Sequence, residues 1–467
     1  MIYIINEKQI FDLLDKFQTP APELIDEIIS EAKLANGISL EQVAALLNIE
    51  NENDLNKIFE TAKYIKQQIY GKRVVLFTPL YLSNFCTNNC LYCGFRIENK
   101  ELNRISLTQD EIRSEVIEIL NQGHKRLLLL MGEHSKKTSL DYLTQSIDTI
   151  YSTQNEKNSN IRRINIEIEP LSNEEFKIIK DVPIGTYTVF QETYHQETYK
   201  KVHLSGKKSD YNWRLEVMHR ALSNGLNDVG IGALFGLFDY RFEVLGLISH
   251  SINLEKEFNV GPHTISIPRL CFAQNAPYSK ANQYEVSDKN FKKLVAILRL
   301  AVPYTGMILS TRENSALRME LLNLGISQIS AGSKTTPGGY KQAFNTNVAN
   351  VADSSQFHLN DNRSCGEIIE NMLEMDFIPS FCTSCYQIGR VGEKFMEITK
   401  PGNIKTFCQP NALVTLKEYL NDYANSAVQQ KGEALIQANL DLLDEKEKEL
   451  AMKLLNKIDV GERGICL

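Results

Sequence analysis

The chain has 467 residues, of which 43% are hydrophobic and 23% charged, the mixture of a folded globular enzyme. That mixture excludes wholesale disorder, a collagen-like repeat and a coiled-coil rod. The formal charge of −7 includes no basic excess that would indicate nucleic acid as a partner. The first residues lack the pattern of a signal peptide, and no apolar stretch reaches about 18 residues, so we expect a cytoplasmic protein without membrane contact.

The periodicity of the chain predicts three parts. Residues 1–72 are polar with a helical pattern, and we expect an N-terminal helical extension. Residues 73–375 alternate short apolar runs with helix-like stretches, which is typical of parallel strands and predicts an α/β fold, a (β/α)₈ barrel of the TIM type. A doubly wound open sheet is the alternative, because periodicity alone cannot close a barrel. The runs are 74–77, 127–131, 164–168, 187–190, 228–231, 263–267, 307–310 and 328–330.

Local signals place several helices. Capping boxes at Thr108 and Ser172 predict two helix starts, and Gly123 stands where the first of these helices should stop. Residues 376–467 are expected to form a separate, mostly helical C-terminal domain. Within it we predict a loop-rich stretch from residue 382 to 408, a helix that begins at Pro410, and a last helix over 445–458.

Three cysteines, Cys86, Cys90 and Cys93, follow the first predicted strand. Reduced thiolates at this spacing favour zinc or an iron–sulfur cluster. A structural zinc site needs four ligands, and no fourth Cys or His lies nearby, whereas a four-iron cluster held by three cysteines keeps one iron open. The spacing, with Tyr92 before the last cysteine, resembles the signature of radical S-adenosylmethionine (SAM) enzymes, and the end of a barrel strand is where barrel active sites form.

This resemblance implies a [4Fe-4S] cluster that binds SAM, and an electron donor such as ferredoxin or flavodoxin. Met131-Gly132-Glu133 resembles the family's Gly-Gly-Glu turn, with Met in place of the first Gly. Glu167 and Glu169 follow the next strand and can point into the barrel, although a structural ion pair is the alternative. The residues expected to contact SAM are Tyr92, Gly132, Glu133, Glu167, Glu169, Arg214, Gly230, Ile231 and Gly232.

A second set of three cysteines, Cys382, Cys385 and Cys408, lies in the C-terminal part. Spacing alone leaves two interpretations open, a second cluster with one open iron or a zinc site completed by Cys365 or Cys466. The segments 382–390, 403–407 and 408–413 resemble the C-terminal domain of the HydG maturases of [FeFe]-hydrogenase. Segments 190–194, 228–236 and 261–266 resemble both these enzymes and the 2-iminoacetate synthases (ThiH), which lack the three-cysteine extension.

The resemblance covers essentially the whole chain and implies a radical SAM carbon–carbon lyase. L-Tyrosine would be cleaved to p-cresol and dehydroglycine, and the latter converted to carbon monoxide and cyanide on an auxiliary [4Fe-4S] cluster with an additional labile iron. The product would be an Fe(CO)(CN) precursor for the hydrogenase, passed to other maturation proteins. The alternatives are 2-iminoacetate synthase of thiamine biosynthesis and a non-catalytic iron–sulfur scaffold.

Two further sites follow from the predicted strand ends. His263, before the sixth strand, reads as a structural histidine on its own, but the resemblance implies that it ligates the additional iron. Ser310, Thr311 and Arg312 end the seventh strand, where the arginine fork suits the carboxylate of tyrosine. The alternative is that Arg312 pairs with Glu313 or Glu320. The remaining cysteines, Cys271, Cys365 and Cys466, are expected to have no role.

Overall fold

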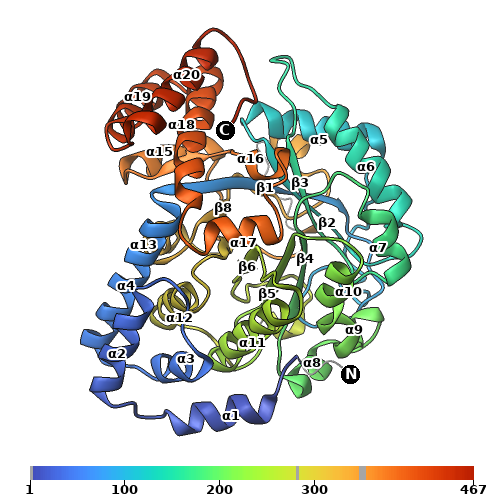
Figure 1. Ribbon diagram of the computed structural model, residues 1–467. Coiled ribbons are helices and arrows are strands. Elements are labelled where there is room, and N and C mark those ends of the chain that lie inside the picture. The colour runs from blue at the N-terminus through green and yellow to red at the C-terminus, as the bar shows by residue number, and fades with distance from the viewer. Residues whose placement is uncertain (1–3, 280–282, 346–353) are drawn as a thin grey trace.

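Eight parallel strands close into a barrel at the centre of the computed structural model, which describes residues 4–279, 283–345 and 354–467 (Figure 1). The strands follow one another from β2 round to β8, and β1 closes the ring by pairing with both β8 and β2. The predicted barrel is therefore confirmed, and the open sheet is excluded. The strands are β1 (Arg73–Ser83), β2 (Arg126–Met131), β3 (Arg163–Glu167), β4 (Tyr187–Glu192), β5 (Val229–Ala233), β6 (Thr264–Ser266), β7 (Gly306–Leu309) and β8 (Gln328–Ser330).

A ninth strand, β9 (Ile378–Ser380), pairs in parallel with the first residues of β1. The sequence pattern did not predict it. It explains why β1 is so long, since the early part of β1 pairs with β9 and β8 and the later part with β2. Because β9 lies beside the start of β1 and leads directly to Cys382, the second cysteine set is delivered to the end of the barrel where the strands begin. The first cysteine set follows the end of β1, at the opposite end.

The N-terminal helices lie along one side of the barrel, where α1, α3 and α4 pack on the barrel helices α11 and α12 (Figure 1). The helices of this part are α1 (Glu7–Lys16), α2 (Pro22–Ala32), α3 (Leu40–Leu47) and α4 (Glu52–Tyr70). Those between the strands are α5 (Gln109–Asn121), α6 (Leu140–Ser152), α7 (Asn173–Ile179), α8 (Gln196–Val202), α9 (Tyr211–Leu215), α10 (Val217–Ser223), α11 (Tyr240–Phe258), α12 (Asp288–Ala301), α13 (Ser315–Leu324) and α14 (Gly339–Asn345), with 3₁₀ turns at Lys207–Ser209 and Pro277–Ser279.

The helix starts and the helix stop predicted from local sequence signals are confirmed at Thr108, Ser172 and Gly123. Both capping boxes form, with Thr108 and Ser172 accepting from the backbone N–H three residues on. Gly123 follows the end of α5 with a φ of 89°, a conformation that favours glycine. No described helix combines the length and the apolar character needed to cross a bilayer.

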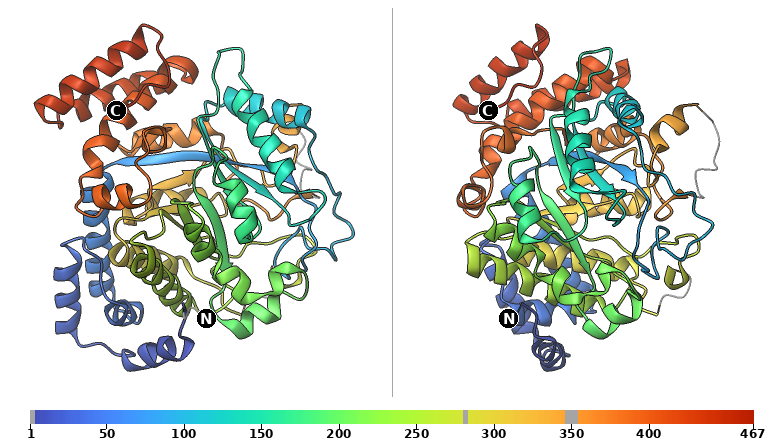
Figure 2. Two further views of the ribbon diagram at one scale, coloured as in Figure 1. Left: turned by 45° about the vertical axis from the view of Figure 1, so that its right-hand side comes forward. Right: turned by 90° about the vertical axis from the view of Figure 1, so that its right-hand side faces the viewer.

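The C-terminal helices α18 to α20 form a group at the opposite side of the molecule from α1, as Figure 2 also shows. The predicted helix start at Pro410 is wrong, because α18 begins at Ile404 and contains Pro410. The proline removes one hydrogen bond, but the apolar residues after it are buried and α18 packs on β9 and α20, which holds the helix together.

The stretch from residue 382 to 408, which was predicted to be rich in loops, contains the helices α16 and α17. The domain limits at residues 72 and 375 remain predictions. The helices are α15 (Cys365–Glu374), α16 (Ser384–Gln387), α17 (Glu393–Thr399), α18 (Ile404–Tyr423), α19 (Ser426–Leu440) and α20 (Glu445–Asp459).

A buried ion pair between Arg318 and Asp361 fastens the segment before α15 to the barrel, and we expect its loss to be costly. Arg318 has no exposed surface and Asp361 is 2% exposed. Asp361→Ala leaves the arginine without its counter-charge, so the free energy of unfolding should fall by about 3–5 kcal/mol in urea titrations. Glu320→Gln is the control, since its pair with Lys292 is half exposed and should contribute less than about 1 kcal/mol. Equal losses in the two variants would contradict this prediction.

Candidate active site and metal centres

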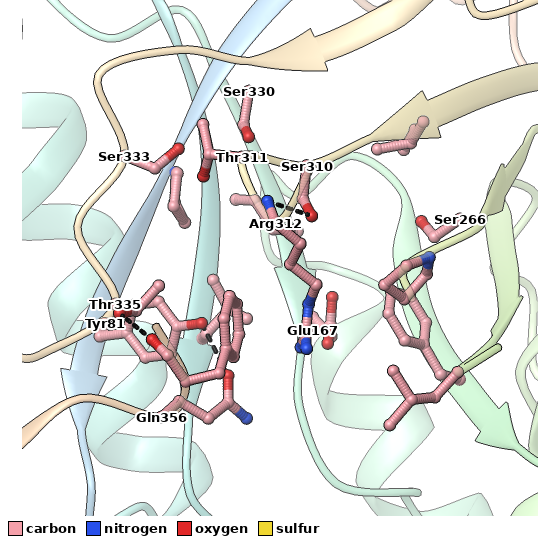
Figure 3. Close-up of a pocket in the computed structure, with 18 of the residues that line it drawn as sticks. Tyr81, Glu167, Ser266, Ser310, Thr311, Arg312, Ser330, Ser333, Thr335 and Gln356 are labelled. Carbon is pink, nitrogen blue, oxygen red and sulfur yellow. Dashed lines mark hydrogen bonds between the residues drawn. The ribbon is translucent and has the colours of Figure 1, made fainter. Parts of the chain in front are cut away.

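A cavity of about 950 Å³, partly open to solvent, lies at the end of the barrel where the strands finish (Figure 3). Its floor comes from inward-facing residues of the strands, and its rim from the residues that follow them. We call it the upper cavity. The residues that line it include Tyr81, Tyr92, Cys93, Glu167, Phe190, Glu192, Lys208, Ser266, Ser310, Thr311, Arg312, Gln356 and Phe357.

One member of the first cysteine set, Cys93, lines the upper cavity, and Cys86 and Cys90 precede it in the same irregular segment after β1. Cys86 and Cys93 border one apolar cluster, and Cys93 also borders a second cluster, to which Cys90 belongs. The loop is held close to the end of β2, because Gly132 donates its N–H to Ser83 and Thr87 donates to the Glu133 carbonyl. A side chain at Gly132 would place its Cβ 2.3 Å from the Phe85 carbonyl oxygen, so this approach requires glycine.

These three thiols fit a cluster better than a single metal ion. Within the described residues, no group of three or more His, Cys, Asp or Glu side chains converges as a single ion requires. The ligands of a cluster bind different irons and need not converge on one point. Burial raises the pKa of all three thiols, to about 11 at Cys86, so binding a cluster here has to release protons.

The predicted contacts to the amino acid part of SAM lie together. Arg214 is 3.4 Å from the Glu133 carboxylate and 3.6 Å from that of Glu192, and all three side chains are at most 11% exposed. Asn88 donates a hydrogen bond to Glu133 at 2.5 Å. A carboxylate beside a guanidinium complements the ammonium and carboxylate of a zwitterion. Tyr92 lines the cavity and is fixed by a 2.8 Å hydrogen bond to His203.

Of the other residues predicted to contact SAM, some line the upper cavity and some do not. Glu167 ends β3 and lines the upper cavity, whereas Glu169 lies beyond the strand and pairs with Lys207 at 3.4 Å. Gly230 and Gly232 face the barrel interior, where an added Cβ would meet Thr188 or Phe190. Ile231 lies in the core between barrel and helices. None of these last three residues lines the upper cavity, and their contact with SAM remains a prediction.

Glu167 should make the stability of the metal-free protein depend on pH. Burial, with the Glu192 charge second, raises the pKa of Glu167 from 4.5 to about 7. The folded state therefore binds this proton more tightly than the unfolded state, and the free energy of unfolding falls as pH rises from about 4.5 to 7. Glu167→Gln removes this loss, which is on the order of 3 kcal/mol. We expect the Tm of the variant, relative to wild type, to be higher at pH 8 than at pH 5; a constant difference would contradict the assignment.

Ser310, Thr311 and Arg312 all line the upper cavity, and Figure 3 shows Arg312 extending toward Glu167. The alternative partners of Arg312 are taken by other residues. Glu313 accepts from Arg269 at 3.0 Å, and Glu320 pairs with Lys292. In the described part of the chain no ion pair involves Arg312, whose guanidinium lies 3.4 Å from the centre of the Phe357 ring. The guanidinium is therefore available to an anionic ligand.

Several residues of the upper cavity were not predicted from the sequence. Lys208 pairs with Glu192 at 2.6 Å, and Gln356 accepts from Tyr81 and donates to the Cys93 sulfur at 3.8 Å. Lys208 and Gln356 lie in irregular segments without a motif. Only the position of Glu192 at the end of β4 carried a usable signal.

A second cavity of about 480 Å³ lies at the opposite end of the barrel, where the strands begin. We call it the lower cavity. Cys382, Cys385, Cys408 and His263 all line it, so the structure brings together the four residues predicted for the auxiliary cluster and its iron. Cys365 is buried in the main core and Cys466 donates to Gln387, and neither lines the cavity, so the zinc alternative lacks its fourth cysteine.

Arginines supply positive charge around the lower cavity. Arg73 and Arg126 line it, and Arg390 is bonded to Ser384 beside Cys385. None of the three forms an ion pair with a described Asp or Glu, and the Nε atoms of Arg73 and Arg390 lack hydrogen-bond partners. The pKa of Cys408 is lowered because Cys385 donates a hydrogen bond to its thiolate and the arginines add positive charge. Arg126 and Arg390 donate to the carbonyl oxygens of Cys382 and Leu467, so their charges have hydrogen bonds but no described Asp or Glu partner. Buried cations of this kind next to thiols fit an anionic metal cluster.

Comparison with known proteins gives concordant matches. The radical SAM superfamily matches residues 80–244, and the biotin and thiamin synthesis associated domain matches residues 266–378. The 2-iminoacetate synthase of Salmonella typhimurium is 34% identical over 67% of this chain and 80% of its own length. A crystal structure of the [FeFe]-hydrogenase maturase HydG is 45% identical, with a TM-score of 0.95 and complete coverage of both chains. HydG from Carboxydothermus hydrogenoformans is 40% identical, with a TM-score of 0.83, and the match covers 96% of this chain and 97% of that one.

Proposed function

The chain belongs to the radical SAM family of tyrosine-cleaving enzymes that contains the HydG maturases and the 2-iminoacetate synthases, and on this premise we propose that it makes an Fe(CO)(CN) precursor from tyrosine. L-Tyrosine is cleaved to p-cresol and dehydroglycine in the upper cavity. Dehydroglycine becomes carbon monoxide and cyanide in the lower cavity. The observation that supports the second step is the lower cavity itself, with three cysteines, a histidine and unpaired arginines.

In the upper cavity the residues of the chain bind and orient. Glu133 and Arg214 hold the ammonium and carboxylate of SAM, and Cys86, Cys90 and Cys93 hold the cluster. When bound, the cluster and SAM would supply 5′-deoxyadenosyl radical chemistry, with electrons from a donor such as ferredoxin or flavodoxin. Arg312 holds the tyrosine carboxylate, with the hydroxyls of Ser310 and Thr311 beside it.

In the lower cavity the chain holds metal and attracts an anion. Cys382, Cys385 and Cys408 would hold the auxiliary [4Fe-4S] cluster, and His263 would ligate the additional labile iron, which would supply the iron of the product. Arg73 and Arg126 favour the carboxylate of dehydroglycine. The atoms of dehydroglycine are those of one carbon monoxide, one hydrogen cyanide and one water, so the step needs no further reactant. Other hydrogenase maturation proteins receive the product.

A second candidate is 2-iminoacetate synthase activity, which the similarity to the Salmonella enzyme favours. That similarity spans 67% of the chain, whereas the similarity to HydG spans all of it. The test is an anaerobic assay of the full chain with SAM, a reductant and tyrosine. We expect p-cresol, carbon monoxide and cyanide. Without p-cresol both lyase assignments fail and a scaffold remains, whereas p-cresol without carbon monoxide, from protein loaded with both clusters, supports the synthase.

A further inference from the structure

His263 is held so that its two ring nitrogens face different surroundings. Its backbone belongs to the barrel, since its N–H donates to Val229 and its carbonyl accepts from Gly306. The ring stacks on Phe395 with centroids 4.1 Å apart. Nε2 lies 3.4 Å from the hydroxyl of Tyr386, the residue after Cys385, and so faces the cysteine-bearing turn. Nδ1 faces away from that turn, toward Asp228.

Asp228 is a buried carboxylate without a hydrogen-bond donor. Its side chain is 5% exposed, it does not line the lower cavity, and neither of its oxygens has a hydrogen-bond partner in the described structure. The potential donors nearest to it are His263 Nδ1 at 3.6 Å and Arg163 at 3.9 Å. Arg163 lies over the Tyr386 ring, 3.2 Å from its centre. A buried carboxylate without a hydrogen bond is costly even beside an arginine, and His263 is the nearer possible donor.

From this arrangement we infer that Asp228 is a positioning residue for the labile iron, acting through His263. A proton on Nδ1 directed at Asp228 leaves Nε2 with its lone pair toward the lower cavity, and a shift of about half an ångström closes the hydrogen bond. Carboxylates behind metal-binding histidines fix the tautomer and the ring orientation in this way. The inference rests on the proposed function, because it requires His263 to be an iron ligand.

The test measures Fe(II) affinity by chelator competition on the full chain with both clusters reconstituted. Asp228→Asn keeps the side-chain shape but removes the charge, and we expect it to weaken Fe(II) binding about 10- to 100-fold. Asp228→Glu keeps the carboxylate and should recover part of the affinity. The iron and sulfide content of the clusters and the Tm report on folding. Unchanged Fe(II) affinity in Asp228→Asn would overturn the inference.

His263→Ala separates this failure from failure of the proposed iron site. If His263→Ala binds Fe(II) as wild type does, the iron ligand itself is wrong; if it loses the iron while Asp228→Asn keeps it, only the role of Asp228 is wrong. A second readout covers poor cluster loading. In metal-free protein labelled with ¹⁵N-histidine, the His263 signals, assigned by their absence from His263→Ala, should show a proton on Nδ1 in wild type and a different tautomer balance in Asp228→Asn. The same balance in both proteins would also overturn the inference.

Discussion

Cys385→Ala should form p-cresol at the rate of the wild-type protein while producing no carbon monoxide. Cys385 lines the lower cavity, at the end of the barrel opposite the upper cavity, the proposed site of tyrosine cleavage. Its removal leaves two cysteines for the auxiliary cluster and also removes the hydrogen bond that favours the Cys408 thiolate. The measurement is chromatography of p-cresol alongside trapping of carbon monoxide by a haem protein, in the same reaction.

Two matched variants bracket this result. Cys93→Ala removes a thiol of the upper cavity and should abolish p-cresol and carbon monoxide together. Cys466→Ala removes a thiol that donates to Gln387 near the lower cavity but does not line it, and both products should stay at wild-type levels. Carbon monoxide from Cys385→Ala at the wild-type yield would show that the second cysteine set holds no working cluster.

The barrel was predictable because its strands are buried on both faces and read as short apolar runs. The elements that escaped prediction break this pattern. The strand β9 has only three residues and includes Pro379, so no run of apolar residues marks it. In α18, Pro410 reads as a first helical position, and only the burial of the following residues against β9 and α20 shows that the helix continues through it.

The candidate site was predictable where its residues belong to a recognisable motif or follow a predicted strand. The spacing of Cys86, Cys90 and Cys93 alone predicted a cluster site. The arginines around the lower cavity come from the starts of β1 and β2 and from the turn after α16, and no local pattern marks them as neighbours. Asp228 precedes β5 and meets His263 only because β5 and β6 are adjacent in the barrel. Charged residues that come from different strands become neighbours only when the barrel closes, so the sequence alone does not show that they meet.

Arg312→Gln should raise the KM for tyrosine by a factor of about 10² to 10³, the loss expected for a two-pronged charge-assisted pair with a carboxylate. The two carboxylates that the sequence offered to Arg312, those of Glu313 and Glu320, pair with Arg269 and Lys292 instead. The guanidinium of Arg312 stacks on Phe357 inside the upper cavity. Its planar fork is thus held in place before tyrosine arrives, which limits the entropy lost on binding. Arg312→Lys keeps the charge without the fork and should fall between the two proteins.

Tyramine, which has the ring and amine of tyrosine but no carboxylate, is the discriminating ligand for Arg312. If the guanidinium binds the carboxylate, the inhibition constant of tyramine against p-cresol formation should be the same in wild type and Arg312→Gln. The KM for SAM should also stay constant, because the residues proposed to hold its amino acid part, Glu133 and Arg214, pair with each other and form no ion pair with Arg312 in the described structure. If tyramine weakens by the same factor as tyrosine, Arg312 shapes the pocket instead of binding the carboxylate. If only the KM for SAM rises, Arg312 serves the cofactor, and the carboxylate of tyrosine has to be sought at Lys208, the other cation that lines the upper cavity.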